Sequence, residues 1–193
     1  MDHGDELERF HPVLLYSILE ATRRFEPDFY AHLCRTYHVD AERILGLFSE
    51  VEVIGSGQLA QLLRDLRAHT AYDDIVYLAG RNSLLIWLEL HDIRRPTLSS
   101  VSAAFAKLVR ELLPPFIGNA SVNVLSRGTL LFIEIRDSVF ARDVRHDRAL
   151  CGFYAGFLFE LGRFCGSPRA AVTETHCSAM DPDGPTCTLE VAL

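Results

Sequence analysis

The feature of the sequence that most constrains its fold is a C-terminal stretch in which metal-ligating residues are concentrated. Residues 151–187 contain Cys151, Glu174, Cys177 and Cys187, and glycine and proline interrupt the segments between them. We expect Cys151 in the opening turn of an apolar helix and the other three side chains on a hairpin. Because tetrahedral zinc accepts four sulfur, nitrogen or oxygen donors, this stretch predicts a zinc clip that joins the helix to the hairpin.

The spacing within the hairpin adds detail to the predicted site. Glu174 and Cys177 are three residues apart, so the strand must bend or end between them if both side chains are to face one ion. The turn at residues 178–186 then folds Cys177 back towards Cys187. His176 is an alternative to Glu174 as the fourth ligand, or a hydrogen-bond donor that offsets the negative charge of the site. Four protein ligands close the site, so its expected role is structural and not catalytic.

The cysteines also allow two interpretations without a permanent metal. They can be ordinary buried thiols, or Cys177 and Cys187 can act in thiol redox signalling that releases zinc on oxidation. The chain has five cysteines, of which Cys34 and Cys165 lie outside the predicted site. Cys165 is about four turns from Cys151 on the same predicted helix, so the two cannot share one ion. Cys34 is far along the chain and is interpreted as a buried thiol.

Composition limits the classes of protein to which the chain can belong. Of its 193 residues 49% are apolar, enough for one domain, or one domain with a helical extension. The net charge of −7 and the lack of a basic patch argue against nucleic-acid binding. Apolar runs are far shorter than the roughly 20 residues of a membrane span, and the polar, acidic N-terminus is no signal peptide. We therefore expect a cytoplasmic protein with reduced cysteines.

The hydrophobic pattern predicts an α+β fold. Residues 1–55 are expected to form a helical N-terminal unit, with helices that begin near Pro12, Pro27 and Asp40. Residues 56–193 then form the ligand-binding domain, in which two hairpins join into an antiparallel sheet with helices packed on one face. Within this domain the pattern predicts helices at 59–66, 75–95, 101–112 and 148–165, and strands at 122–124, 131–135, 170–176 and 187–193.

Two glycine patterns have different interpretations. Gly55, Gly57 and Ala60 match the G-x-G-x-x-A fingerprint of dinucleotide-binding folds, but no series of alternating strands and helices follows. We therefore interpret this segment as a glycine-rich turn and not as a nucleotide site. Gly152 and Gly156 lie four residues apart on the predicted cysteine helix, which indicates that another element approaches its backbone closely.

The C-terminal pattern resembles the 4-vinyl reductase domain family. The matching residues are the segment LCGFYAGF at 150–157, the segment ETHC at 174–177, and then Gly184 and Cys187. The resemblance covers about residues 120–193. It implies a small-molecule sensor whose fold is similar to the vesicle-tethering TRAPP subunits and to the heme-based nitric-oxide sensors. It also implies zinc held by the residues that match Cys151, Glu174, Cys177 and Cys187.

The chain also departs from this family pattern. It has no G-x-x-x-x-G-K-[ST] motif, so an output ATPase is not expected. Phenol sensors carry a tryptophan near the hairpin, whereas this chain has Leu130, Leu131 and Phe132 there. The Y-x-S-x-R signature of the nitric-oxide sensors is absent, so the resemblance is not extended to heme.

These observations favour a non-enzymatic, zinc-stabilised protein that binds a hydrophobic or aromatic small molecule. The expected lining of the ligand site is Phe105, Phe132, Phe153 and Phe157, although each of these also suits plain core packing. The signal is expected to pass through a protein partner, and the N-terminal unit suits a homodimer interface. Two alternatives stay open: a tetrapyrrole-pathway accessory protein or reductase, and a structural assembly module.

Overall fold

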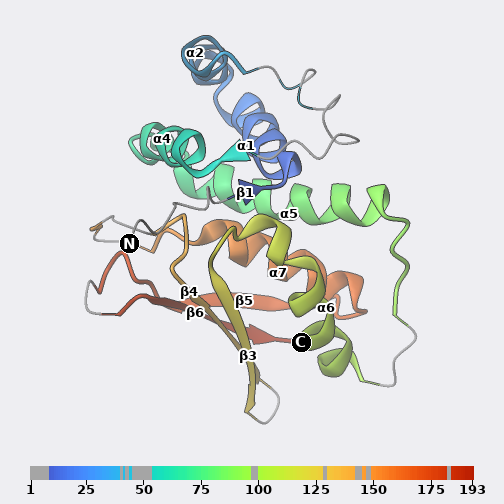
Figure 1. Ribbon diagram of the computed structural model, residues 1–193. Coiled ribbons are helices and arrows are strands. Elements are labelled where there is room, and N and C mark those ends of the chain that lie inside the picture. The colour runs from blue at the N-terminus through green and yellow to red at the C-terminus, as the bar shows by residue number, and fades with distance from the viewer. Residues whose placement is uncertain are drawn as a thin grey trace, which may run out of the picture.

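The computed structural model describes residues 9–39, 41, 44, 54–96, 100–127, 130–141, 145–146, 149–181 and 184–193. Helices near the N-terminus stack on a central helical layer, and an antiparallel sheet lies on the far side of that layer (Figure 1). The elements are β1 (Arg9–Phe10), α1 (Pro12–Phe25), α2 (Pro27–Tyr37), β2 (Ile54–Gly55), α4 (Ser56–Arg67), α5 (Tyr72–Leu90), α6 (Val101–Leu112), η2 (Pro114–Phe116), β3 (Ser121–Arg127), β4 (Leu130–Arg136), α7 (Gly152–Phe164), β5 (Ala171–His176) and β6 (Thr186–Ala192).

The sheet confirms the predicted α+β class and the joining of two hairpins. Its strands pair antiparallel in the order β3-β4-β6-β5. The last strand of the chain, β6, therefore lies between β4 of the first hairpin and β5 of the second. Leu131, Ile133 and Ile135 of β4 are buried, whereas the residues between them are partly exposed. This alternation gives the sheet one apolar face, which α7 and α6 cover, as the period of a half-buried strand requires.

Proline and serine set the starts of three helices as the sequence predicts. Pro12 and Pro27 open α1 and α2, where a missing N–H removes no hydrogen bond. The Ser100 side chain accepts a hydrogen bond from the Ala103 amide at the start of α6. Helix α5 ends at Leu90, earlier than the predicted residue 95, because Asp92 adopts a left-handed φ of 45°. The helix predicted at Asp40 lies largely outside the described residues.

Helices α5 and α7 cross in direct backbone contact. A Cβ atom added to Gly156 would overlap the carbonyl oxygen of Tyr77, and one added to Gly80 would overlap that of Phe153. Gly152 packs against the Val76 side chain. The glycine spacing on α7 thus predicted a real close approach, and Gly80 on α5 is its unpredicted counterpart.

The glycine fingerprint forms no dinucleotide fold within the described residues. Gly55 ends the two-residue strand β2, which pairs antiparallel with β1, and Gly57 lies in the first turn of α4. All described strand pairs are antiparallel, whereas a dinucleotide fold needs a parallel sheet. No dinucleotide-binding fold is formed by the residues described there, but the two glycines belong to the end of a strand and the start of a helix and not to the predicted turn. Among the helices described, none has both the length and the apolar character needed to cross a membrane.

A buried cluster of three thiols and a carboxylate

Four predicted ligand residues converge where α7 begins. Cys151 is the N-cap residue of α7, Glu174 lies on β5, Cys177 follows that strand, and Cys187 lies on β6. The pairing of β5 with β6 is irregular between Glu174 and His176, so the strand bends there as the spacing predicted. One ligand atom from each of these four residues lies within 4.8 Å of the others.

The three sulfur atoms lie close together and are shielded from solvent. The Cys151 Sγ is 3.1 Å from the Cys187 Sγ, which is 3.9 Å from the Cys177 Sγ. Each of these cysteines is at most 1% exposed. All three are free thiols, so the cluster is not a disulfide site in this structure.

Backbone amides point at the cluster from three sides. The Leu150 amide donates to the Cys177 Sγ at 3.4 Å, and the Ser178 amide donates to the Cys187 Sγ at 3.4 Å. The Cys151 amide donates to the Glu174 Oε2 at 3.2 Å. Such donors stabilise anionic ligands, so the backbone favours thiolate and carboxylate forms at this point.

Glu174 retains one oxygen without a protein partner. Its Oε1 is buried and accepts no hydrogen bond from the described residues. Desolvation by burial, and then the nearby Cys177, raise the pKa of this carboxyl to about 8. A buried oxygen of this kind is costly unless another group, a proton or a cation, satisfies it.

The Cys151 and Cys187 thiols are hydrogen-bonded, and their pKa values are shifted in opposite directions. Burial raises the pKa of Cys151, which is enclosed on all sides. Hydrogen bonds from Cys151, then Cys177, and then Ser178 lower the pKa of Cys187. Burial therefore favours the neutral thiol at Cys151, whereas hydrogen bonds favour the anion at Cys187.

The structure also separates the predicted alternatives at this site. His176 lies outside the cluster, with its Nε2 3.9 Å from the Asp181 Oδ2, so Glu174 and not His176 is the fourth converging group. Cys165 caps the opposite end of α7, and Cys34 lies on α2. Sequence reasoning missed Ser138 and Ser178, whose hydroxyls lie 3.7 Å from the Cys151 Sγ and 3.3 Å from the Cys187 Sγ.

The predicted ligand-lining phenylalanines fall into two groups. Phe105, Phe153 and Phe157 are fully buried between the helices and the sheet. The Phe153 ring stacks on Phe140 with centroids 4.9 Å apart. Phe132 is partly exposed on the opposite face of β4, with the Arg127 guanidinium 5.4 Å from its ring centroid. The structure therefore does not bring Phe132 to the other three.

Comparison with known proteins identifies the fold. No family model matches the sequence, and no curated protein matches it. The fold is similar to an H-NOX protein from S. oneidensis in the Fe(II)NO ligation state, with a TM-score of 0.61 and 13% identity, over 95% of this chain and 99% of that chain. It is also similar to an unliganded Fe(II) H-NOX mutant from K. algicida, with a TM-score of 0.59 and 13% identity, over 95% and 96% of the two chains.

A third solved structure with a similar fold is described with a cofactor. It is described in terms of heme redox potential and protein-induced porphyrin distortion, and it matches at a TM-score of 0.60 and 11% identity, over 95% of this chain and all of that chain. The expected similarity to heme-based nitric-oxide sensors in fold is therefore confirmed. The prediction of zinc as the cofactor is contradicted, because the proteins that share this fold are described with heme and Fe(II).

The described residues of this chain nevertheless do not fit heme. Protein ligands of heme iron are histidine, cysteine, methionine or tyrosine beside an apolar slot. No histidine in the described part of the chain is buried, and Met180 is 54% exposed. The buried Tyr72 hydroxyl donates to the Leu150 carbonyl, and the Tyr154 hydroxyl accepts from Ser138. The buried cysteines face one another, and the glycine contacts close the space between α5 and α7.

Proposed function

We propose that this protein is a sensor domain of the H-NOX-like fold that binds a small molecule and holds one metal ion in its cysteine cluster. The observation that carries the proposal is the convergence of four ligand atoms within 4.8 Å in a buried site. The buried Oε1 of Glu174, which has no protein partner among the described residues, supports the proposal because a cation would satisfy it. The amides that donate to Cys177 and Cys187 also support it, because they stabilise negative charge on the sulfurs and a cation would balance that charge.

The ion in this proposal joins two separate parts of the chain. Cys151 belongs to α7, whereas Glu174, Cys177 and Cys187 belong to the β5–β6 hairpin. Bound metal would therefore hold the first turn of α7 against the edge of the sheet. Because all four positions are protein ligands, its role is to set the position of this helix and not to activate water.

The small molecule in this proposal is apolar and enters beside Phe105, Phe153 and Phe157. Phe153 and Phe157 are buried side chains of α7 itself, so a ligand beside them would act on the same helix that the ion holds. The resemblance to the 4-vinyl reductase family and to TRAPP subunits supports a small apolar ligand, a protein partner for output and a homodimer. The division after residue 55 and a cytoplasmic location belong to the same proposal.

Native mass spectrometry of the purified full chain tests the metal part. We expect the mass of one metal ion per chain in the wild type and in Cys34→Ala, whose thiol lies on α2, and its loss in Cys177→Ala. A wild-type chain without bound metal would contradict the proposal. The same spectrum gives the oligomeric state and the mass of any organic molecule that co-purifies.

Thermal unfolding with a panel of small aromatic hydrocarbons tests the ligand part. Binding to the folded state raises Tm, and the stabilisation grows with the logarithm of one plus the ratio of ligand concentration to Kd. We expect a rise in the wild type and in Phe132→Leu, because Phe132 lies on the opposite face of the sheet. The rise should be reduced in Phe157→Leu, and equal rises in the two variants would place the ligand elsewhere.

A further inference from the structure

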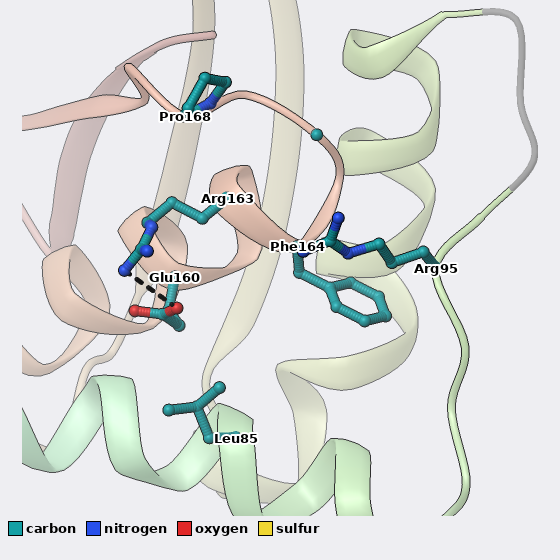
Figure 2. A pocket seen from close by; sticks show the side chains of 7 residues that line it. Leu85, Arg95, Glu160, Arg163, Phe164 and Pro168 are labelled. Carbon is teal, nitrogen blue, oxygen red and sulfur yellow. Dashed lines mark hydrogen bonds and ion pairs between the residues drawn. The ribbon is translucent and has the colours of Figure 1, made fainter.

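A second candidate site lies at the other end of α7. A hollow of about 390 Å³ opens between the C-terminal halves of α5 and α7, and its volume is in the lower part of the range of small-molecule pockets. Figure 2 shows its side chains approaching from α5, from the segment after α5 and from α7. The lining residues are Leu85, Arg95, Glu160, Arg163, Phe164, Gly166 and Pro168.

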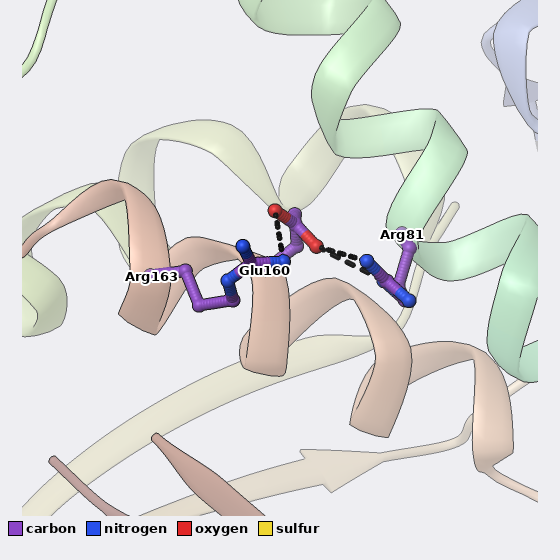
Figure 3. Close-up of polar contacts among 3 residues, drawn as sticks. All are labelled: Arg81, Glu160 and Arg163. Carbon is purple, nitrogen blue, oxygen red and sulfur yellow. Dashed lines mark hydrogen bonds and ion pairs between the residues drawn. The ribbon is translucent and has the colours of Figure 1, made fainter. Parts of the chain in front are cut away.

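The one carboxylate in this lining is already neutralised. Glu160 is 8% exposed, and its Oε2 accepts from the Arg81 Nε at 2.9 Å, with the Arg81 Nη2 also at 2.9 Å. Its Oε1 lies 3.5 Å from the Arg163 Nη1. Figure 3 shows Glu160 between the two guanidinium groups, one from each helix. Both arginines also lie over the Phe159 ring, which holds them in place.

Arginine is therefore in excess around the hollow. Arg95 has no hydrogen bond or ion pair with any described residue, and Figure 2 shows its guanidinium beside the Phe164 ring. Arg163 contacts Glu160 only at 3.5 Å and is 47% exposed, so its remaining N–H groups are available to a ligand. The Arg95 guanidinium can therefore attract an anion, and its planar donor set matches carboxylate and phosphate oxygens.

The rest of the lining is apolar. Leu85 of α5 is an apolar side chain that is 47% exposed, and Phe164 and Pro168 complete the wall. A purely inorganic anion would leave these surfaces in contact with water. The combination fits a ligand with one anionic group and an apolar body of roughly a dozen heavy atoms, judged from the volume that water molecules occupy.

We propose that this hollow binds a small amphipathic organic anion, with its carboxylate or phosphate group on Arg95 and its apolar body on Leu85 and Phe164. The site lies at the opposite end of α7 from Cys151, so it goes beyond the proposed function and does not depend on the metal cluster. Its failure would leave the cluster proposal standing, because the two tests use different side chains and different readouts.

Isothermal titration calorimetry of the full chain tests this site with three probes: 4-phenylbutyrate, phenyl phosphate and the uncharged 4-phenylbutyramide. We expect at least one of the anions to bind, and the amide to bind at least tenfold more weakly than the better anion. The preference between the two anions identifies the head group. Equal affinity for the amide and the anions, or no binding of either anion, would overturn the proposal.

Variants at exposed positions keep the test separate from folding. Arg95→Ala should weaken anion binding at least tenfold, and Leu85→Asn should weaken it severalfold by removing an apolar contact. Arg169→Ala is the matched control, because Arg169 is exposed nearby in the sequence but does not line the hollow, and its affinity should equal that of the wild type. An unchanged affinity in Arg95→Ala would contradict the assignment.

Discussion

Gly156 of α7 lies so close to the carbonyl oxygen of Tyr77 on α5 that no side chain fits between them. This contact brings the two central helices together and fixes the position of α7, the helix on which the cysteine cluster and the arginine-rich hollow both depend. Its counterpart is Gly80, which lies against the Phe153 carbonyl in the same crossing.

Substitution Gly156→Ala should destabilise the fold strongly. The added methyl group overlaps backbone and not a flexible side chain, so the helices must separate, at a cost of about 3 kcal/mol or more. For a chain of this length the expected fall in Tm is roughly 6–12 °C. The matched control is Gly57→Ala on α4, where no atom lies near the new Cβ and helix propensity should raise Tm slightly. Similar Tm values for both variants would contradict this account.

Substitution Tyr72→Phe should weaken the proposed metal site without altering any of the four residues proposed to hold the ion. The Tyr72 hydroxyl donates to the Leu150 carbonyl at 3.0 Å, and the Leu150 amide in turn donates to the Cys177 Sγ. Loss of the hydroxyl leaves a buried carbonyl unpaired, at a cost of about 1–3 kcal/mol. We expect faster loss of metal to a chelator than in the wild type. Tyr77→Phe is the control, since its hydroxyl bonds to no described residue, and equal rates in the two variants would remove this role.

The stability of the fold should depend on the protonation of His11. This residue caps α1 by accepting from the Val13 amide, and its ring lies 4.7 Å from that of Trp87. Burial, and then the neighbouring His91, lower the pKa of His11 below 6.5. Between the lowered pKa and pH 6.5, His11 therefore binds more protons in the unfolded chain than in the folded one. Its contribution to the free energy of unfolding is complete above pH 6.5 and falls as the pH drops from 6.5 to the lowered pKa.

Urea unfolding from pH 5 to 7.5 measures this dependence. Asparagine also caps helices but does not titrate here, so His11→Asn should keep the cap and flatten the pH dependence relative to the wild type. Identical slopes for the two proteins would show that His11 does not contribute. Trp87 is the only tryptophan of the chain, so its fluorescence reports on the same site.

The sequence predicted the cysteine cluster better than the aromatic site. For Glu174 and Cys177 to share one site, their spacing requires the strand to bend or end between them. The irregular pairing of β5 with β6 supplies this bend. Phe132 was misplaced although the alternation of Leu131, Ile133 and Ile135 already implied that it points away from them. A period-two pattern shows which residues of a strand share a face of the sheet. Phe132 was assigned to the ligand site because it is aromatic, without regard to the face of the strand on which it lies.

Other parts of the structure depend on contacts that no local pattern shows. The ion pairs of Glu160 join α7 to Arg81, far away in sequence, and the Tyr72–Leu150 hydrogen bond spans a similar distance. Helix α5 ends at Leu90, where the backbone of nearby Asp92 is left-handed, whereas the sequence pattern predicted a helix that continues to residue 95. Each of these is set by tertiary packing, which outweighs local preference.

Elemental analysis combined with the visible absorption spectrum of the purified protein, produced in cells supplied with a heme precursor, tests the central claim most directly. The account predicts one equivalent of a metal that is lost in Cys187→Ser and retained in Cys165→Ser, with no heme band in either protein. Stoichiometric heme in the wild type, retained in Cys187→Ser, would contradict it and would show that the chain shares the cofactor as well as the fold of the H-NOX proteins.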